Sequence, residues 1–321
     1  MIEVRNLSKT FALKGGGTLK AVRDVSLRVA KGETLGIVGE SGCGKSTLAR
    51  LLLHLISPSS GEVIINGEVL GKLSAKLLRA KRRDAQMIFQ DPQASLDPRM
   101  KVAALIEEPL VIHRIGTAAE RTQRVQELCA LVGLPADAAS RFPHEFSGGQ
   151  RQRIAIARAL ALEPALIVAD EPVSALDVSI QAQILNLLTE LKKKFGLTYV
   201  FISHDLAVIR HISDKVAVMY LGQIVESGTA DAVLGNPAHP YTQMLMAAVL
   251  EPGIKQPAMA VTGEPPNPES PPPGCGFHPR CPHAMDICRA RAPVIKTIGA
   301  PEQQHTTQCW LYAGDESLPL R

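Results

Sequence analysis

Long hydrophobic runs are absent from this sequence of 321 residues. Its longest apolar stretches, such as Leu51–Leu53 and Met244–Leu250, fall far short of the roughly 20 apolar residues that a membrane-spanning helix needs. We therefore expect that the chain does not itself cross a bilayer. The first residues, Met1–Arg5, also lack the basic and then apolar pattern of a secretory signal, which leads us to expect a cytosolic location.

An excess of one charge is also missing, because 35 Lys and Arg residues are balanced by 31 Asp and Glu residues and leave a net charge of +4. So mild a charge indicates no strongly basic surface for nucleic acid. One stretch, residues 72–83, is locally basic, and it is either a solvated face or a segment near anionic lipid head groups. The six cysteines are not expected to form disulfides, because the cytosol keeps thiols reduced.

The sequence does contain a glycine-rich loop at Gly39–Thr47 that fits the phosphate-binding pattern G-x-x-x-x-G-K-[ST]. The loop follows an apolar run, Leu35–Val38, typical of a buried strand, and it precedes Leu48–Leu53, typical of a helix. Glycines let backbone N–H groups converge on phosphate oxygens, while Lys45 is expected to reach the β- and γ-phosphates and the Ser46 hydroxyl to hold Mg²⁺. The predicted nucleotide contacts in the loop are Gly39, Ser41, Gly42, Gly44, Lys45, Ser46 and Thr47.

Two adjacent carboxylates, Asp170 and Glu171, follow the apolar run Ala165–Ala169, which is typical of a buried parallel strand. Ligands of α/β sheets bind at the carboxyl ends of such strands. We expect Asp170 to position Mg²⁺ through water and Glu171 to polarise the attacking water as general base. The alternative is an ordinary acidic turn before Pro172.

Three further residues are candidates for the same site. Gln90 follows the predicted strand Gln86–Phe89, and it is either a turn residue or a group that reaches Mg²⁺ or the attacking water. His204 follows the predicted strand Thr198–Ile202, and we favour contact with the γ-phosphate over a structural role. Phe11 has polar, Gly-rich surroundings, and its ring is equally suited to stack on adenine or to pack in the core.

A second glycine-opened helix begins at Phe146–Gln150. Ser147 and Gln150 have the spacing of a capping box, which accounts for both as helix-start residues. It does not account for Gly148 and Gly149, since each glycine in a helix costs about 1 kcal/mol relative to alanine. Exposed N–H groups at a helix start bind anions, so we expect a second phosphate-competent site in the chain.

Over about residues 1–250 the chain resembles the ATP-binding cassette (ABC) ATPases. The motifs that carry the resemblance, in the family's order, are the phosphate loop, Gln90, the Phe146–Gln150 signature, Asp170–Glu171, Ser174–Asp177 and His204. The resemblance implies an α/β P-loop fold, with a mixed sheet core, an antiparallel β subdomain and a helical subdomain at about residues 100–160. It also implies that two cassettes sandwich two ATP molecules, each between one phosphate loop and the other cassette's signature helix.

The same resemblance implies roles for individual residues. By position, Phe11 resembles the adenine-stacking aromatic, Gln90 the sensor that links nucleotide to a membrane partner, Glu171 the catalytic base, Asp177 the contact across the dimer and His204 the γ-phosphate switch. The implied Mg²⁺ residues are Ser46, Gln90 and Asp170. The implied contacts to the partner's ATP are Ser147, Gly148, Gly149 and Gln150.

Two segments narrow the subgroup, because Asn236–Thr242 and Pro271–Cys275 resemble ATPase subunits of dipeptide, oligopeptide and nickel importers, most closely the dipeptide permease ATPases. This implies ATP-driven uptake of di- or oligopeptides by a peripheral subunit on the cytoplasmic side of the inner membrane. The implied partners are a paralogous second ATPase subunit, two transmembrane permease subunits and an extracytoplasmic substrate-binding protein, with no nucleic acid. The alternatives are import of nickel or another small solute, and a soluble ATPase that does not transport.

Residues 251–321 form a predicted C-terminal extension that is rich in proline and cysteine. Four of the six cysteines lie there, at Cys275, Cys281, Cys288 and Cys309. Their spacing is not the paired C-x₂-C of a typical zinc ribbon. The resemblance implies a [4Fe–4S] cluster on these four thiolates. A Zn²⁺ site that also draws on His278, His283 or His305, and a reduced set without metal, stay open as alternatives.

Overall fold

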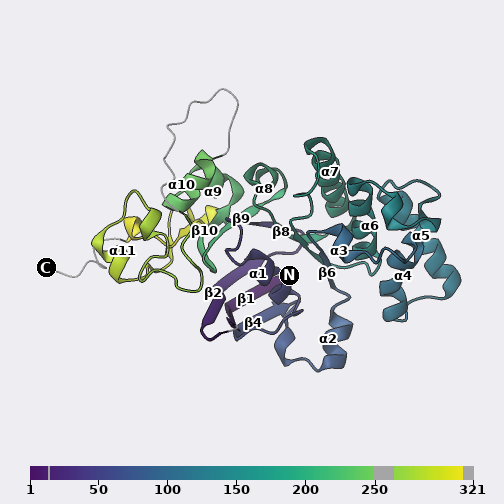
Figure 1. Ribbon diagram of the computed structural model, residues 1–321, viewed down its shortest axis with the longest axis horizontal. Helices are drawn as coiled ribbons and strands as arrows, with labels where there is room; N and C mark the ends of the chain where they lie inside the picture. The colour runs from purple at the N-terminus through teal and green to yellow at the C-terminus, as the bar shows by residue number, and fades with distance from the viewer. Residues whose placement is uncertain (14, 249–263, 314–321) are drawn as a thin grey trace.

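The computed structural model describes residues 1–13, 15–248 and 264–313. The predicted boundary between cassette and extension, at residues 250 and 251, lies outside the described residues. The described chain is elongated, with helices α4 (Val102–Ile112) and α5 (Ala118–Leu131) at one end and α11 (Asp286–Ala290) at the other (Figure 1). A large sheet runs through the middle and positions the residues of the candidate site.

This central sheet has eight strands. Across the sheet they are β11 (Lys296–Thr297), β12 (Thr306–Thr307), β10 (Gln223–Thr229), β9 (Lys215–Tyr220), β3 (Thr34–Val38), β8 (Thr198–Ile202), β7 (Leu166–Asp170) and β6 (Ala85–Ile88). Strands β9, β3, β8, β7 and β6 run parallel, whereas β10, β12 and β11 pair antiparallel. Every residue of β3, β7 and β8 is buried, as unbroken apolar runs predict. The predicted mixed sheet is confirmed.

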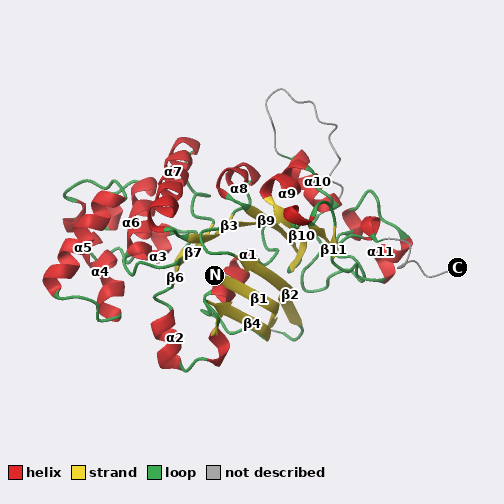
Figure 2. Cartoon of the chain, turned by 180° about the vertical axis from the view of Figure 1, so that it is seen from behind, coloured by secondary structure: helices red, strands yellow, loops and turns green. Residues whose placement is uncertain are grey.

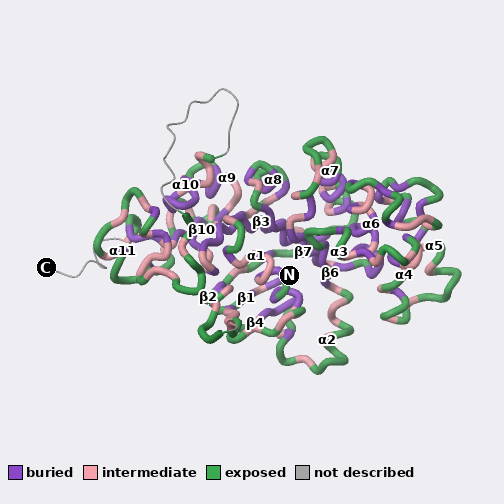
Figure 3. The backbone as a smooth tube through the Cα atoms, in the orientation of Figure 1, coloured by how far each residue is buried: buried purple, intermediate pink, exposed green. Residues whose placement is uncertain are grey.

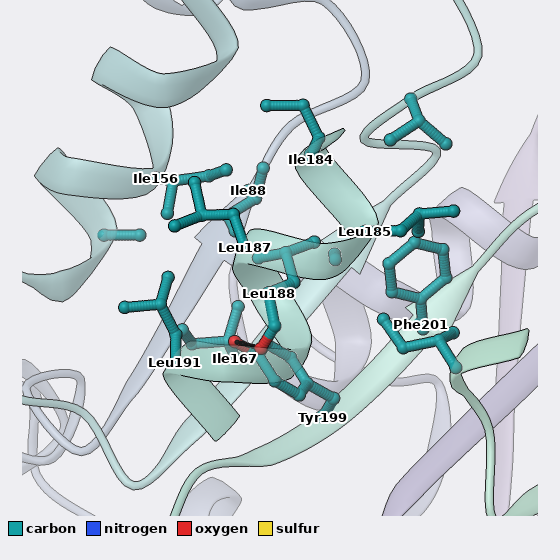
Figure 4. Close-up of a cluster of buried hydrophobic side chains, with 14 of the residues drawn as sticks. Ile88, Ile156, Ile167, Ile184, Leu185, Leu187, Leu188, Leu191, Tyr199 and Phe201 are labelled. Carbon is teal, nitrogen blue, oxygen red and sulfur yellow. Dashed lines mark hydrogen bonds between the residues drawn. The ribbon is translucent and has the colours of Figure 1, made fainter. Parts of the chain in front are cut away.

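Helix α7 (Val178–Phe195) packs its apolar stripe into the core beside the parallel strands (Figure 4). Leu188 is fully buried there with Phe201 and Tyr199 of β8. The Tyr199 hydroxyl donates a 3.3 Å hydrogen bond to the Leu188 carbonyl oxygen, which ties the helix to the strand. Gly196, with a φ of 63°, ends α7 in the left-handed conformation that closes a last helical turn.

A smaller antiparallel sheet covers helix α1 (Lys45–Leu52). Its strands, in order, are β2 (Thr18–Val29), β1 (Ile2–Ala12), β4 (Ser60–Ile65) and β5 (Glu68–Val69). Leu48 of α1 is buried in one apolar cluster with Val22 and Ile65 of this sheet. Figure 2 shows β1, β2 and β4 together on one side of the large sheet, with α1 beside them. The predicted antiparallel β part is thus present.

Helices dominate the stretch between β6 and β7. Besides α4 and α5 they are α3 (Pro92–Ser95), η2 (Ala138–Ser140), η3 (Pro143–Glu145) and α6 (Gly148–Leu160). Phe146, the first residue of the predicted signature, is a packing residue, because it is 3% exposed and the Arg141 guanidinium lies 4.6 Å from its ring centroid. The prediction of a mostly helical stretch over residues 101–141 is confirmed.

The basic stretch of residues 72–83 begins at the last residue of η1 (Leu70–Lys72) and contains α2 (Ala75–Lys81). Two of its lysines are paired within the chain: Lys72 Nζ lies 2.6 Å from Glu62, and Lys81 Nζ lies 2.6 Å from Glu68 and 3.0 Å from Asp84. Part of the positive charge is therefore neutralised locally, which favours a solvated face over a lipid-binding segment.

The C-terminal part of the described chain packs against the open edge of the large sheet. Its helices are α8 (Leu206–Ile212), α9 (Ala230–Gly235), α10 (Pro240–Ala247), η4 (His278–Arg280), α11, η5 (Pro301–Gln303) and η6 (Trp310–Tyr312). Strand β12 pairs with β10, and Phe277 is buried in one apolar cluster with Tyr220 and Tyr241, so this region shares the sheet and core of the preceding residues (Figure 3). Nowhere in the described ranges is a helix both long and apolar enough to span a membrane.

Candidate nucleotide-binding site

The glycine-rich loop lies between β3 and α1, in the strand–loop–helix order that the sequence predicts. Gly44 precedes α1 with a φ of 110°, a conformation that residues with a Cβ rarely adopt. A Cβ on Gly44 would overlap the carbonyl oxygen of Ala21, and one on Gly39 would overlap that of Met219. Close backbone approaches therefore require glycine at both positions.

Lys45, the first residue of α1, is only 4% exposed. Its Nζ donates to the carbonyl oxygens of Gly39 at 2.7 Å and of Glu40 at 3.0 Å, and it lies 4.0 Å from Oε1 of Glu171. A buried ammonium group needs such partners. The loop thus holds the lysine at the cavity, where a phosphate oxygen can replace the carbonyls.

Asp170, the last residue of β7, faces Ser46 at the start of α1. The Ser46 hydroxyl donates a 3.1 Å hydrogen bond to Oδ1 of Asp170. Burial raises the pKa of Asp170 above its ordinary value, and the hydrogen bond from Ser46 partly opposes this rise. A hydroxyl next to a carboxylate offers the oxygen ligands that Mg²⁺ prefers. Two of the three predicted Mg²⁺ residues are therefore in contact.

Glu171 lies where the ends of three parallel strands meet. Its Oε2 accepts a 3.0 Å hydrogen bond from Nε2 of Gln90 and lies 3.2 Å from Nδ1 of His204. Its φ of 46° is left-handed, which costs a non-glycine residue about 1–2 kcal/mol, and its N–H donates to the carbonyl of Ile202 at 2.9 Å. The strand ends thus bring together the three residues predicted to be catalytic.

These groups line an open cavity of about 620 Å³. Its walls include residues 41–47, Gln90, Glu171, His204 and Phe11. Phe11 lies on β1 and is 36% exposed, with Lys9 Nζ 5.1 Å from its ring centroid. The core-packing alternative for Phe11 is therefore wrong, and its ring is available at the rim of the cavity. Asp170 and Gly39 support the loop without lining this cavity.

A second cavity, of about 720 Å³, adjoins the first. It lies between α1, β6 and α4, and its lining includes Arg50, Met87, Glu108 and Arg158. Ser46 and Gln90 line both cavities, so the loop site and this groove share two residues.

The predicted signature does not join the loop site of this chain. Its capping box is confirmed, because the Gln150 N–H donates to Ser147 Oγ at 3.4 Å and the Ser147 N–H donates to Gln150 Oε1 at 3.1 Å. Ser147 and Gly148 are exposed at the start of α6. A Cβ on Gly149 would lie 2.5 Å from Cγ2 of Ile180, so packing against α7 explains this glycine without an anion. Packing therefore gives a reason for glycine at position 149 that does not depend on an anion, and the anion site at this helix start stays a prediction.

Asp177 also lies outside the loop site. It immediately precedes α7, is exposed, and makes no capping hydrogen bond with its side chain. The next residue, Val178, is 81% exposed.

Comparison with known proteins decides the family. Residues 22–174 match the family described as "ABC transporter", and residues 225–288 match "Oligopeptide/dipeptide transporter, C-terminal region". The oligopeptide transport ATP-binding protein AppF of Bacillus subtilis is 50% identical, over 98% of this chain and 98% of its own length. The chain belongs to the ABC transporter ATPases. The di/tripeptide transport ATP-binding protein DppF of Pseudomonas aeruginosa is also 50% identical, over 93% of this chain and 94% of its own length.

Solved structures agree with this assignment. The dimeric ABC cassette MJ0796 bound to ADP and phosphate has a TM-score of 0.66 and 33% identity, and the match covers 72% of this chain and 99% of that one. The predicted P-loop cassette fold of this ABC ATPase is thereby confirmed, and with it an enzyme that binds and hydrolyses ATP.

The four cysteines that were predicted to bind a metal lie in the C-terminal region of this ABC ATPase. Cys275, Cys281, Cys288 and Cys309 are all free thiols, and burial raises the pKa of Cys309 to about 11. In the described ranges, no three His, Cys, Asp or Glu side chains are grouped so that they could hold a metal ion.

The histidines proposed for zinc have other partners. His305 Nε2 lies 2.7 Å from Oε1 of Glu226, and His278 Nδ1 lies 2.9 Å from the Cys275 carbonyl oxygen. The expectation that these two histidines serve as zinc ligands therefore lacks support in the structure.

Sequence reasoning gave no role to one residue of the loop, Glu40, and missed two residues that contact it, Tyr241 and Arg280. The Glu40 carboxylate binds Arg280, and its N–H donates to the Tyr241 hydroxyl. Tyr241 lies in the Asn236–Thr242 segment, which marked the subgroup without indicating a contact. Arg280 carried no local signal, since 240 residues separate it from its partner.

Proposed function

We propose that this chain is the ATP-hydrolysing subunit of an importer of di- or oligopeptides. The observation that carries the proposal is the convergence of Gln90, His204 and Lys45 on Glu171 at the end of β7. The names of the relatives and the C-terminal family support peptides as the cargo. Import of nickel or another small solute by the same subgroup is the alternative.

In the proposed reaction, the loop's N–H groups and Lys45 bind the β- and γ-phosphates, and Phe11 stacks on the adenine. Ser46, Gln90 and Asp170 would hold Mg²⁺, which would neutralise charge on the phosphate oxygens. Glu171 takes the proton of the attacking water as it moves to the γ-phosphate. His204 contacts the γ-phosphate and, with Gln90, orients the Glu171 carboxylate. The remaining contacts come from Gly39, Ser41, Gly42, Gly44 and Thr47.

The site is completed by a second cassette in this proposal. The start of α6, where Ser147 and Gly148 are exposed, binds the partner's ATP through Ser147, Gly148, Gly149 and Gln150, and Asp177 contacts the partner across the interface. Support comes from the position of these residues outside the loop site and from the dimeric cassette to which the chain is similar. We propose a paralogous partner, because the subgroup of the resemblance uses two different ATPase subunits.

The groove of about 720 Å³ is the proposed docking site for a transmembrane permease subunit. Gln90 lines both this groove and the ATP cavity, so it can report bound nucleotide to the permease. The complete complex would hold two permease subunits and an extracytoplasmic substrate-binding protein, with this chain on the cytoplasmic side of the membrane and no nucleic acid. We propose residues 1–250 as the cassette, residues 100–160 as its helical subdomain and residues 251–321 as its cysteine-bearing extension.

A [4Fe–4S] cluster on the four cysteines is the proposed resident group of the extension. Cys288 accepts on its carbonyl from the Cys275 N–H at 2.8 Å, and the electrostatic influence of Cys275, Cys281 and Cys288 contributes to the raised pKa of Cys309. These two observations support the proposal, although the described ranges contain no three side chains grouped so that they could hold a single metal ion. Each thiolate of such a cluster binds a different iron, so the set need not converge on one point as a single Zn²⁺ requires. When bound, the cluster would tie together the chain segments that carry the four cysteines.

Hydrolysis and transport are tested with Glu171→Gln in the intact transport complex. The change keeps the size of the side chain and removes the base, so ATP turnover and uptake of a labelled dipeptide should fall by about 10²–10⁴-fold while ATP binding persists. Glu163→Gln, at a side chain that is 77% exposed, is the matched control and should leave both rates unchanged. Normal turnover in the Glu171 variant would remove Glu171 as base.

Normal dipeptide uptake together with lost nickel uptake, in cells without this subunit, would favour the alternative cargo.

The metal is tested by measuring iron, acid-labile sulfide and zinc in the full chain purified without oxygen. About four irons and four sulfides per chain are expected, and Cys288→Ser should lower both. Zinc alone, or no metal, would refute the cluster.

A further inference from the structure

Glu40, the second residue of the phosphate loop, is held at each of its polar groups. Its N–H donates a 2.8 Å hydrogen bond to the Tyr241 hydroxyl. Its carbonyl oxygen accepts from Lys45 Nζ at 3.0 Å. Its carboxylate accepts two hydrogen bonds from the Arg280 guanidinium, at 2.7 Å and 2.8 Å. The same residue therefore links the phosphate-binding lysine to the C-terminal region.

Arg280 is built into the core beneath the loop. Its side chain is 3% exposed, and its Nη2 also lies 3.7 Å from the Met244 sulfur. Its guanidinium lies 5.8 Å from the ring centroid of Phe277, which packs with Tyr220 and Tyr241 at centroid distances of 5.4 Å and 5.5 Å. A buried arginine in bidentate contact with one carboxylate is geometrically fixed, and breaking such a pair leaves the other charge without compensation.

The charge of Glu40 makes this pair important for nucleotide binding. The loop must receive a polyphosphate, and a carboxylate in the loop repels that ligand unless a cation neutralises it. Lys45 does not neutralise the Glu40 carboxylate, because its ammonium group donates to the carbonyl oxygens of Gly39 and Glu40 and lies 4.0 Å from Glu171 Oε1. Among the described residues, Arg280 is the cation in contact with the Glu40 carboxylate.

We propose that Arg280 is a positioning residue of the ATP site, which neutralises Glu40 and fixes the phosphate loop in its nucleotide-receptive form. In this arrangement the C-terminal region is a functional part of the ATP site. The inference rests on ATP binding alone and holds whichever solute is imported and whichever metal, if any, the cysteines bind.

The test is ADP binding to the full-length chain, measured by calorimetry, because ADP occupies the loop without requiring a partner cassette. Arg280→Met keeps the length of the side chain against Phe277 and leaves Glu40 charged, so ADP affinity should fall about tenfold. Glu40→Gln in the Arg280→Met background removes the unpaired charge and should restore most of that loss. Arg280→Lys should lie between the wild type and Arg280→Met, since it keeps the charge and loses the bidentate geometry.

A control separates this role from simple attachment of the C-terminal region. His305 lies 2.7 Å from Glu226 and is buried with it, so His305→Ala loosens the same region without touching Glu40. It should lower the melting temperature and leave the ADP affinity of the folded protein near that of the wild type. Equal loss of ADP affinity in Arg280→Met and His305→Ala, or no recovery in the Arg280→Met/Glu40→Gln double variant, would overturn the proposal.

Discussion

Acid should destabilise this ATPase through a buried histidine, His239, that caps α10. Its side chain is 1% exposed, its Nδ1 accepts a 3.0 Å hydrogen bond from the Tyr241 N–H, and burial lowers its pKa from 6.5 to about 4. The Tyr241 that it orients is the residue whose hydroxyl contacts the phosphate loop. Protonation of His239 would therefore strain both the helix start and a contact of the ATP site.

The sign and size of the effect follow from the two pKa values. Between pH 6.5 and pH 4 the unfolded chain binds this proton and the folded chain does not, so stability falls as the pH falls. A pKa difference of one corresponds to about 1.4 kcal/mol. The difference between 6.5 and about 4 therefore removes about 2 kcal/mol of unfolding free energy by pH 5 and about 3 kcal/mol by pH 4.

The assay is urea unfolding of the wild type and of His239→Asn between pH 7.5 and pH 5. Asparagine is a good helix N-cap, so the variant keeps an acceptor for the Tyr241 N–H and loses the titrating ring. The variant should be less stable at pH 7.5 because it packs less well, and the gap should narrow by about 2 kcal/mol at pH 5. A gap that stays constant over this range would refute the reasoning, because other acid-sensitive groups affect both proteins equally.

Three further predictions concern the loop, the metal residue and the core. Lys45→Ala should weaken ADP binding by at least about tenfold, because a buried charged partner of the phosphates is lost; unchanged affinity in calorimetry would contradict its assignment. Asp170→Asn should raise the free energy of unfolding of the Mg²⁺-free chain at pH 7.5, because the raised pKa of Asp170 shows that its ionised form is costly in the folded protein. This gain should vanish in urea unfolding at acid pH, where Asp170 is protonated in both the folded and the unfolded chain. A lower free energy of unfolding at pH 7.5 would contradict this prediction. Leu188→Ala, at a fully buried position, should cost about 2–5 kcal/mol of unfolding free energy, whereas Val178→Ala, at an 81% exposed position, should stay within about 0.5 kcal/mol; similar costs would contradict the packing.

The predictable part of the molecule is the part encoded by local pattern. The unbroken apolar runs before Asp170 and His204 indicated buried parallel strands, and β7 and β8 are buried at every residue. The Ser147–Gln150 spacing indicated a capping box, and both of its hydrogen bonds are present. Such signals work because strands and helix starts depend on residues only a few positions apart.

What local pattern could not decide came from contacts between distant residues. Gly149 was interpreted as a bare backbone for an anion, and the structure adds a second reason for glycine, because Ile180 on the neighbouring helix leaves no room for a Cβ. Phe11 was left open between core and site, and only the position of β1 at the cavity showed that it is not a core residue. The pairing of β12 in the C-terminal region with β10 of the large sheet had no signal in the sequence pattern.

By itself, the sequence determined the phosphate loop, the order of the motifs and the chemistry each residue brings, because these depend on residue type and short spacing. The tertiary structure alone decided which groups meet. Glu171 meets Gln90 and His204 because three parallel strands end at one edge of the sheet, and Glu40 meets Arg280 because the C-terminal region folds back beneath the loop. Contacts between residues far apart in the chain depend on the packing of the whole core, which no local spacing records.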